Sequence, residues 1–140
     1  ADCTILAIPV NAIVEVLPLV LDLANADHTV IDFGSTKAAI CQSVKSHPNR
    51  SSFVAAHPIA GTEYSGPMAS FAELFDHKVM ITCEEGLSGK SLLETYHRFC
   101  RVLGMQMRSM EAEAHDLHLA YVSHLSHITS FALSTAVFKK

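Results

Sequence analysis

Polar side chains with potential reactivity follow three apolar segments of the chain, at the points where those segments end. The junctions are residues 8–11, 32–37 and 56–63. In an open parallel sheet, the carboxyl ends of the strands meet at one edge, and ligands bind in the crevice beyond that edge. Because three consecutive segments end in this way, the sequence predicts a ligand site at that edge of the sheet.

His57 and Ser35 are the side chains at these junctions that are best suited to chemistry. With an ordinary pKa of about 6.5, the His57 imidazole can accept a proton near neutral pH; alternatively, it is a strand-end histidine that caps a turn. Pro58 restricts the backbone after it, and Gly61 allows close approach of a ligand. Ser35 is the expected N-cap of the next helix, a role compatible with an anionic ligand at the helix N-terminus.

Two charged residues at the same junctions keep two interpretations each. Lys37 would lie one turn into the helix that Ser35 caps, either as a solvated surface side chain or as a ligand contact. Glu63 either caps the segment that follows or lines the pocket.

Nine histidines invite a metal interpretation, which their spacing restricts. His115 and His118 share one face of a predicted helix, and His124 and His127 share another. Nine steps of about 100° place the two pairs on opposite sides of an ideal helix, which excludes one four-histidine site. A zinc site of two histidines and an additional ligand stays open, but a pair facing a polar cleft is favoured, so no metal is predicted.

The elements that must position these residues are predicted from apolar runs and their punctuation. Buried strands are expected at residues 4–8, 28–33 and 52–56, with helices over residues 12–24 and 35–45 between them. Pro18 would kink the first helix or begin a second segment. Strands that alternate with helices are βαβ units, so the sheet should be parallel.

The second half of the chain continues this pattern and then changes character. It predicts a loop at residues 57–67, a short helix at 68–74, strands at 78–83 and 105–109, and an amphipathic helix over 88–103 that Gly104 ends. Residues 111–138 contain no Gly or Pro and predict one long, apolar helix. This helix is too long to cover a small sheet, so we divide the chain into domains at 1–110 and 111–140.

Composition excludes several classes of partner. The net charge of −4 and the scattered lysines and arginines argue against a nucleic-acid or anionic-lipid surface. The most apolar run, residues 4–21, is interrupted by Glu15 and two prolines, so no membrane span is expected. Four single cysteines without a CxxC pair are typical of reduced cytosolic thiols.

Taken together, the motifs resemble the prephenate dehydrogenase family of tyrosine biosynthesis. The matching stretches are residues 7–10, 32–37 (DFGSTK), 57–66 (HPIAGTEYSG), 115–116 and 123–127 (SHLSH), in the family's order. Ser126 departs from the proline that the family usually has. The resemblance implies an α/β fold: the second half of a Rossmann-like parallel sheet, followed by the first long helix of an all-helical dimerisation domain. The family's GxGxxG half is absent, so we expect the chain to be the middle of a longer protein.

The resemblance also implies an activity and a set of residues. The activity is NAD- or NADP-dependent oxidative decarboxylation of prephenate to 4-hydroxyphenylpyruvate by a cytoplasmic homodimer. His57 would accept the proton of the ring hydroxyl, and Ser35 would hold that hydroxyl. The implied substrate-binding residues are Thr62, Glu63, Ser123, His124 and His127, and the implied cofactor-binding residues are Pro9, Ser35, Thr36 and Pro58.

Three other functions stay open from the sequence. An arogenate dehydrogenase shares the fold and the chemistry, and Glu63 could favour the ammonium group of arogenate. A non-catalytic relative that kept the scaffold is opposed by the intact Ser35 and His57 positions. A histidine-rich metal module is opposed by the spacing of the histidine pairs.

Overall fold

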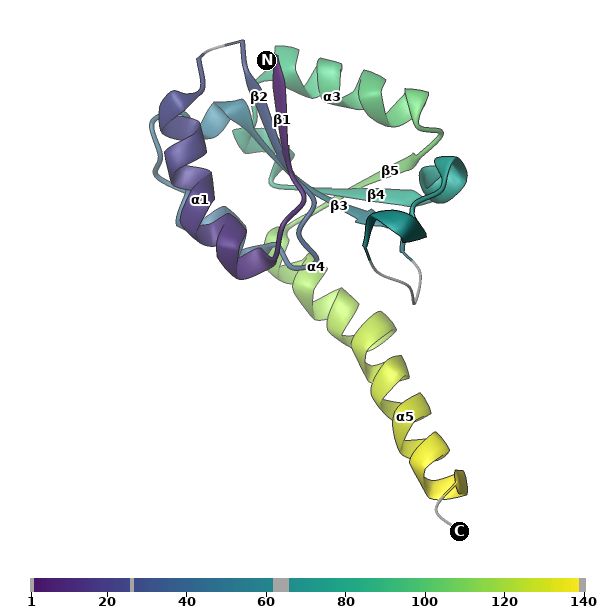
Figure 1. The fold of residues 1–140 in the computed structure, drawn as a ribbon. Helices are drawn as coiled ribbons and strands as arrows, with labels where there is room; N and C mark the ends of the chain where they lie inside the picture. The colour runs from purple at the N-terminus through teal and green to yellow at the C-terminus, as the bar shows by residue number, and fades with distance from the viewer. Residues whose placement is uncertain (1, 26, 62–65, 139–140) are drawn as a thin grey trace.

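The parallel strands of the sheet form where the apolar runs predict them. A computed structural model describes residues 2–25, 27–61 and 66–138, and among these residues five strands form one sheet in the order β1-β2-β3-β4-β5 (Figure 1). β1 (Cys3–Leu6), β2 (Thr29–Asp32) and β3 (Phe53–Ile59) are parallel neighbours. The helices that connect them are α1 (Val10–Leu23) and α2 (Ala38–Ser43). The predicted βαβ units are therefore confirmed, and Pro18 lies within α1 without dividing it.

The expectation of a fully parallel sheet is wrong for the second half. β4 (Val79–Cys83) runs antiparallel to β3, and β5 (Gln106–Met110) runs parallel to β4. A parallel β4 would need a crossover helix on one face. The described part of the β3–β4 connection instead holds only 3-10 turns, Pro67–Ala69 and Ala72–Phe75, in place of the predicted helix at 68–74. Phe71 between them has extended backbone angles, which prevents one continuous helix.

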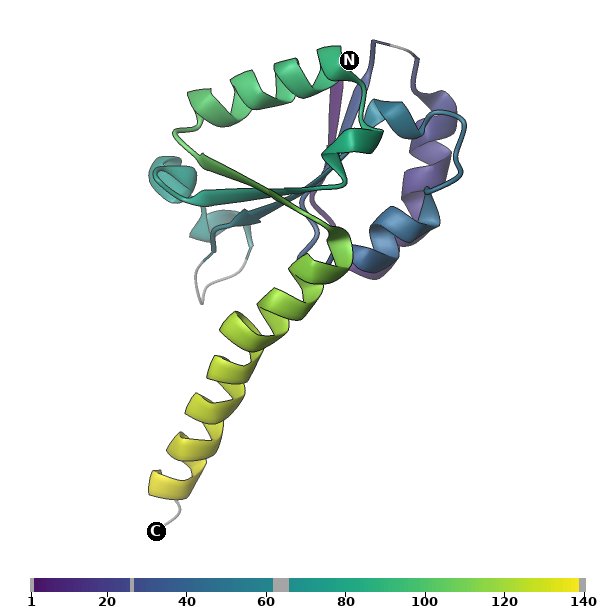
Figure 2. The ribbon, with the colours of Figure 1, turned by 180° about the vertical axis from the view of Figure 1, so that it is seen from behind.

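Helices cover both faces of the sheet, and the alternation of side chains along the strands explains why (Figures 1 and 2). Val30, Phe53 and Ala55 face one side, where they pack with α1 and α2. Their neighbours face the other side, where they pack with Tyr96 and Cys100 of α3 (Lys90–Val102). Because successive strand residues point to opposite faces, strands that are apolar throughout require this double cover.

The remaining features of the fold are the end of α3, two short turns and the cysteines. Gly104, with φ of 68°, ends α3 as predicted, because glycine adopts left-handed backbone angles without strain. Further 3-10 turns lie at Arg50–Ser52 and Glu85–Leu87. All four cysteines are free thiols, and Cys41, Cys83 and Cys100 are buried.

The predicted long helix is present, with one irregular turn inside it. α4 (Ala112–Leu119) continues through a π-helical turn (Ala120–His124) into α5 (Leu125–Phe138), and Figure 1 shows α5 projecting away from the sheet. Large apolar side chains of the π-helical turn and of α5 are exposed in this chain; they include Tyr121, Leu125, Ile128, Phe131 and Leu133. Within the described residues, no helix combines the length and apolarity that a membrane span requires.

A buried ion pair fixes the β2–α2 connection beneath the sheet edge. The Lys37 ammonium contacts the Asp32 carboxylate, and both side chains are fully buried. Asp32 also accepts hydrogen bonds from the backbone N–H groups of Gly34 (2.9 Å) and Ala56 (3.3 Å), and Lys37 Nζ donates to the Ala56 carbonyl (2.9 Å). Burial raises the pKa of the Asp32 carboxyl, and Lys37 opposes that rise. The pair thus joins the end of β2 to β3.

Replacing Gly34 by alanine should destabilise the protein through overpacking. A Cβ atom at Gly34 would lie 2.7 Å from Ile40 Cδ1, closer than real Cβ contacts, and 3.0 Å from Asp32 Oδ2, tighter than most of them. Overpacking of this kind costs about 1–3 kcal/mol. Denaturant unfolding of the complete protein measures the loss. Gly86→Ala is the matched control, because a Cβ there meets no atom within 4 Å. Equal stability of the two variants would contradict the prediction.

Replacing Lys37 by methionine should destabilise the fold strongly. Methionine keeps an unbranched side chain but leaves the Asp32 carboxylate buried without its cation. Removing one partner of a buried ion pair costs about 3–5 kcal/mol. Lys45→Met, at an exposed lysine just beyond α2, should change the free energy of unfolding by less than about 0.5 kcal/mol. A Lys37→Met protein as stable as the Lys45→Met protein would overturn this account of the pair.

Candidate active site

The carboxyl ends of β1, β2 and β3 bring residues distant in sequence to one edge of the sheet. Asp32 pairs in register with Leu6 of β1 and with Ala55 of β3. The exposed Pro9 and Ser35 and the half-buried Thr36 follow the ends of β1 and β2, and the half-buried His57 and Pro58 lie in the last residues of β3. The structure therefore places the cofactor-binding and catalytic residues predicted at these junctions along the same edge.

His57 lies on a strand, where the sequence predicted a loop. β3 continues beyond Ala56 to Ile59 because β4 pairs with it there: His57 is opposite Ile81, and Pro58 is opposite Met80. The parallel partner β2 has already ended at Asp32. A strand supports the imidazole more rigidly than a loop would, which suits a group that must hold a defined position.

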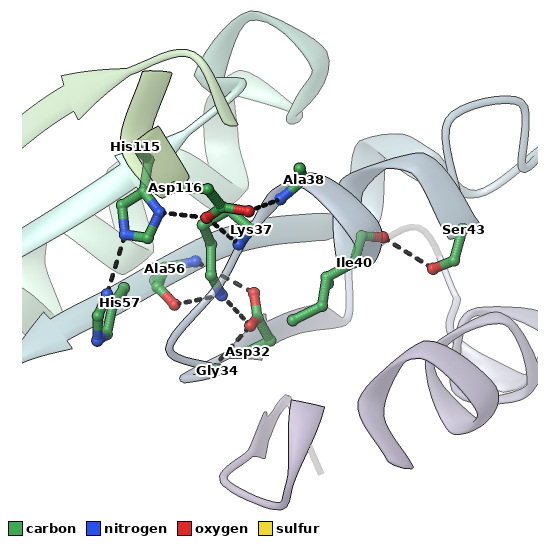
Figure 3. A network of polar contacts seen from close by, with 10 residues as sticks. All are labelled: Asp32, Gly34, Lys37, Ala38, Ile40, Ser43, Ala56, His57, His115 and Asp116. Carbon is green, nitrogen blue, oxygen red and sulfur yellow. Dashed lines mark hydrogen bonds and ion pairs between the residues drawn. The ribbon is translucent and has the colours of Figure 1, made fainter. Parts of the chain in front are cut away.

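Ser35 is not the N-cap of α2. The helix begins three residues later, at Ala38, with Lys37 at the N-cap position and no capping by its side chain. The Asp116 carboxylate of α4 supplies the cap instead. Its Oδ1 accepts the Lys37 N–H at 2.7 Å, and its Oδ2 accepts the Ala38 N–H at 2.9 Å (Figure 3). The Ser35 hydroxyl is therefore free of the capping role that the sequence assigned to it.

The chemistry of the Asp116 carboxylate follows from these donors. Burial alone would raise the pKa of Asp116, but the N–H of Ala38, the His115 ring and the N–H of Lys37 together hold that pKa below its ordinary value. Asp116 is therefore ionised at neutral pH, and its negative charge lies at the helix N-terminus, where the macrodipole favours it.

A third hydrogen-bond partner of Asp116, the His115 ring, leads directly to His57. His115 Nδ1 lies 2.7 Å from Asp116 Oδ1, and His115 Nε2 lies 2.9 Å from His57 Nδ1. The His115 ring is fully buried and meets the His57 ring edge-on, with 5.1 Å between the centroids. Figure 3 shows His115 standing between the other two side chains.

The pKa of His57 lies below the ordinary histidine value of about 6.5. Burial, followed by the charges of His115 and Lys37, lowers the pKa of His57 to about 4, while Asp116 opposes the shift. The imidazole is therefore neutral at pH 7 and has the lone pair that a proton acceptor needs. A role as a turn cap alone does not account for a ring held in strand β3 by a buried partner.

The surroundings of Lys37 differ from both interpretations that the sequence allowed. It is neither a solvated surface side chain nor placed to contact a ligand, because its ammonium is fully buried between Asp32 and Ala56. The signal that could have revealed this is the Asp32 carboxylate itself, which ends a fully buried strand and therefore needs a cation nearby.

Several predicted substrate-binding residues lie outside the part of the chain that the structure describes. Thr62 and Glu63 belong to the undescribed residues 62–65, and the side chains of Ser123, His124 and His127 are likewise undescribed. The π-helical turn also removes the ideal-helix spacing that put the two histidine pairs on opposite sides. Among the described residues, no group of three His, Cys, Asp or Glu side chains could hold a metal ion.

The residues at this edge fit one part of a nicotinamide cofactor. The β1–α1 connection, residues 7–9, has no glycine, and Pro9 has no N–H, so this turn does not cradle a pyrophosphate. Exposed Ile8 and Pro9 offer an apolar surface for a flat ring, and the hydroxyls of Ser35 and Thr36 offer polar contacts. The donor set therefore suits the nicotinamide end of the cofactor.

Comparison with known proteins identifies the family. Residues 1–109 match the family described as prephenate dehydrogenase, nucleotide-binding domain. The chain is 33% identical over 134 residues to cyclohexadienyl dehydrogenase from Zymomonas mobilis, covering 95% of this chain and 45% of that protein. It is 31% identical over 136 residues to prephenate dehydrogenase from Lactococcus lactis, covering 95% of this chain and 36% of that protein. The chain thus spans less than half the length of these relatives.

Solved structures agree with the sequence comparison. Prephenate dehydrogenase from Aquifex aeolicus superposes with a TM-score of 0.85 at 32% identity, covering 96% of this chain and 48% of that one. A second structure of the Aquifex aeolicus enzyme, in complex with hydroxyphenyl propionate and NAD+, matches with the same TM-score. The fold, the strand-end site and the matched residues 1–109 lead to one conclusion: the chain belongs to the prephenate dehydrogenase nucleotide-binding domain family.

Proposed function

We propose that the protein carrying this chain oxidises and decarboxylates prephenate to 4-hydroxyphenylpyruvate, with NAD or NADP as the cofactor. The observation that carries the proposal is the His57 imidazole, which is neutral at pH 7 and held by His115 at the edge where the strand ends converge. Family membership over residues 1–109 supports the same activity.

His57 is the proton acceptor in this reaction. Nδ1 of its ring is engaged by His115, so Nε2 is the atom that receives the proton of the substrate's ring hydroxyl. As that proton leaves, the carbon that bears the hydroxyl loses its hydride and becomes a carbonyl carbon. Loss of CO2 then leaves the electrons of the broken C–C bond in the ring, which becomes aromatic, and the phenolate oxygen takes the proton back from His57. Because aromatisation drives the reaction, positioning and proton acceptance are the main tasks of the protein.

The exposed Ser35 supports His57 at the same edge. Its hydroxyl is not used to cap α2, so it can hold the substrate hydroxyl beside the base. When bound, the nicotinamide cofactor supplies the hydride acceptor. Pro9, Ser35, Thr36 and Pro58 would hold its nicotinamide end, because the first three follow the ends of β1 and β2 and Pro58 lies near the end of β3, at the same edge.

The remaining predicted residues complete the proposal on the substrate side. Thr62, Glu63, Ser123, His124 and His127 would bind prephenate, whose two carboxylates require donors. Arogenate carries an ammonium group in place of the side-chain keto group, and the acidic Glu63 is the residue that could favour it. The activity of the protein should therefore be measured on prephenate and on arogenate.

The partner that we propose for the long helix is a second copy of the same protein. α5 exposes large apolar side chains around much of its circumference, among them Leu125, Ile128 and Phe131. A helix of this kind is normally buried against other helices. We place the reaction in the cytoplasm, the compartment expected from the family and from the four single cysteines.

Replacing His57 by asparagine should separate catalysis from folding. The amide keeps a hydrogen-bonding group but cannot accept a proton near neutral pH, so kcat for prephenate oxidation should fall by about 10²–10⁴. This fall corresponds to about 2.7–5.4 kcal/mol of transition-state stabilisation. KM should change much less. His97→Asn, on α3 away from the edge, is the matched control and should keep normal turnover. A folded His57→Asn enzyme with near-normal kcat, on both prephenate and arogenate, would refute the assignment.

The pH dependence of the wild-type enzyme tests the same group. The base is active when it is unprotonated, and its pKa is lowered to about 4, so kcat/KM should stay constant from pH 7 to about pH 5. Activity should then fall as the pH approaches 4 and His57 becomes protonated. Melting curves at each pH separate this fall from acid unfolding. A decline centred near the ordinary histidine pKa of about 6.5 would contradict the described surroundings of His57.

The complete protein should be a dimer through the apolar side chains of α5. Light scattering should give twice the mass of one chain at micromolar concentration, and Ile128→Glu should halve that mass by placing a charge in the interface. Leu23→Glu, at an exposed leucine in the last turn of α1, is the matched control and should stay dimeric. A monomeric wild-type protein would exclude this partner.

A further inference from the structure

Asp116 links two parts of the site that are far apart in sequence. Its carboxylate accepts the backbone N–H groups of Lys37 and Ala38, which lie directly after Ser35 and Thr36. The same carboxylate contacts the His115 ring, which contacts His57. Asp116 of α4 is therefore hydrogen-bonded to the start of α2 and, through the His115 ring, to His57 of strand β3 (Figure 3).

When both histidine rings are neutral, the donors and acceptors of these three side chains permit one arrangement of protons. A carboxylate can only accept hydrogen bonds, so His115 Nδ1 must carry a proton and donate to Asp116 Oδ1. When Nδ1 carries the only proton of the His115 ring, Nε2 is an acceptor. His57 Nδ1 must therefore carry a proton and donate to His115 Nε2. The His57 nitrogen that remains without a proton is Nε2.

We propose that Asp116, acting through His115, is a positioning residue that fixes the tautomer and the orientation of His57. Because Asp116 also holds the first N–H groups of α2, it keeps the Ser35–Thr36 turn and the His57 ring in a fixed relation. This inference rests on the proposed function, since it supplies the reason why Nε2 of His57 is the proton acceptor.

The burial of the chain supports a role beyond capping. An exposed carboxylate would suffice to cap α2, yet the ring between Asp116 and His57 is fully buried. A buried imidazole whose nitrogens both have partners cannot rotate without losing two hydrogen bonds. The buried His115 ring therefore fixes the orientation of His57 before a substrate binds.

The tautomer of His57 can be measured directly in the complete wild-type protein. Nitrogen-15 NMR of the histidine side chains at pH 7, without substrate, distinguishes a protonated ring nitrogen from a bare one. We expect His57 to show a protonated Nδ1 and a bare Nε2, with the signals assigned by their loss in His57→Asn. The opposite tautomer, or a mixture, would overturn the inference whatever the activity of the protein.

Two variants separate positioning from capping. His115→Phe keeps a ring in the buried space and leaves Asp116 on α2, but it removes the acceptor for His57 Nδ1. Outer partners of this kind typically contribute about 10–100-fold, so kcat should fall by that factor with little change in KM or melting temperature, and His57 should become a mixture of tautomers. Asp116→Asn should show the same loss of kcat and also a lower melting temperature, because the amide cannot accept from both N–H groups.

Matched controls lie on the same helix. His118→Phe and Glu113→Gln change an exposed ring and an exposed carboxylate, and both should leave kcat and the His57 signals unchanged. A purely structural role predicts a lower melting temperature for His115→Phe with normal kcat and an unchanged His57 tautomer, which would overturn the inference. A wild-type protein that is inactive on prephenate and arogenate would instead refute the proposed function, while the NMR measurement would still decide the tautomer.

Discussion

The site depends on the burial of one lysine. The side chain of Lys37 runs inward to Asp32 and the Ala56 carbonyl, while its backbone N–H points to Asp116. Two carboxylates from distant parts of the chain therefore hold the same residue, one by its ammonium and one by its main chain. Moving a charged pair out of water is costly, and only good geometry with further hydrogen bonds compensates for it. This requirement fixes the end of β2, the start of α2 and their separation from β3.

His57 derives its chemical properties from that arrangement. Burial lowers the pKa of His57, and the neighbouring His115 ring and the positive charge of Lys37 lower it further. The polar groups beneath the edge thus keep the base neutral, while the strand that carries it is fixed by pairing on β4. Stability and reactivity are connected here, because the same buried groups are responsible for both.

Local sequence patterns predicted the elements of this fold better than they predicted its long-range contacts. The apolar runs located the strands, and the structure places the predicted residues His57 and Ser35 at one edge of the sheet. The direction of β4 was missed because an apolar run has no direction of its own. The contact between His57 and His115 spans 58 residues, and no local periodicity reports such a pair. Asp116 lies within a matching stretch, residues 115–116, but its sequence position indicates no capping role, because α2 begins 78 residues earlier and Ser35 is the nearer candidate for the cap.

The π-helical turn at Ala120–His124 has a geometric consequence for everything that follows it. Such a turn accommodates one extra residue, and each residue of an α-helix occupies about 100° around the axis. Leu125 and Ile128 are therefore rotated by about that angle from the positions that a regular helix would give them relative to Leu117. The exposed apolar side chains of α5 and the buried face of α4 that holds His115 can therefore take independent directions on one continuous helix. A helix anchored at one end by His115 and Asp116 can therefore present a differently oriented surface at the other end.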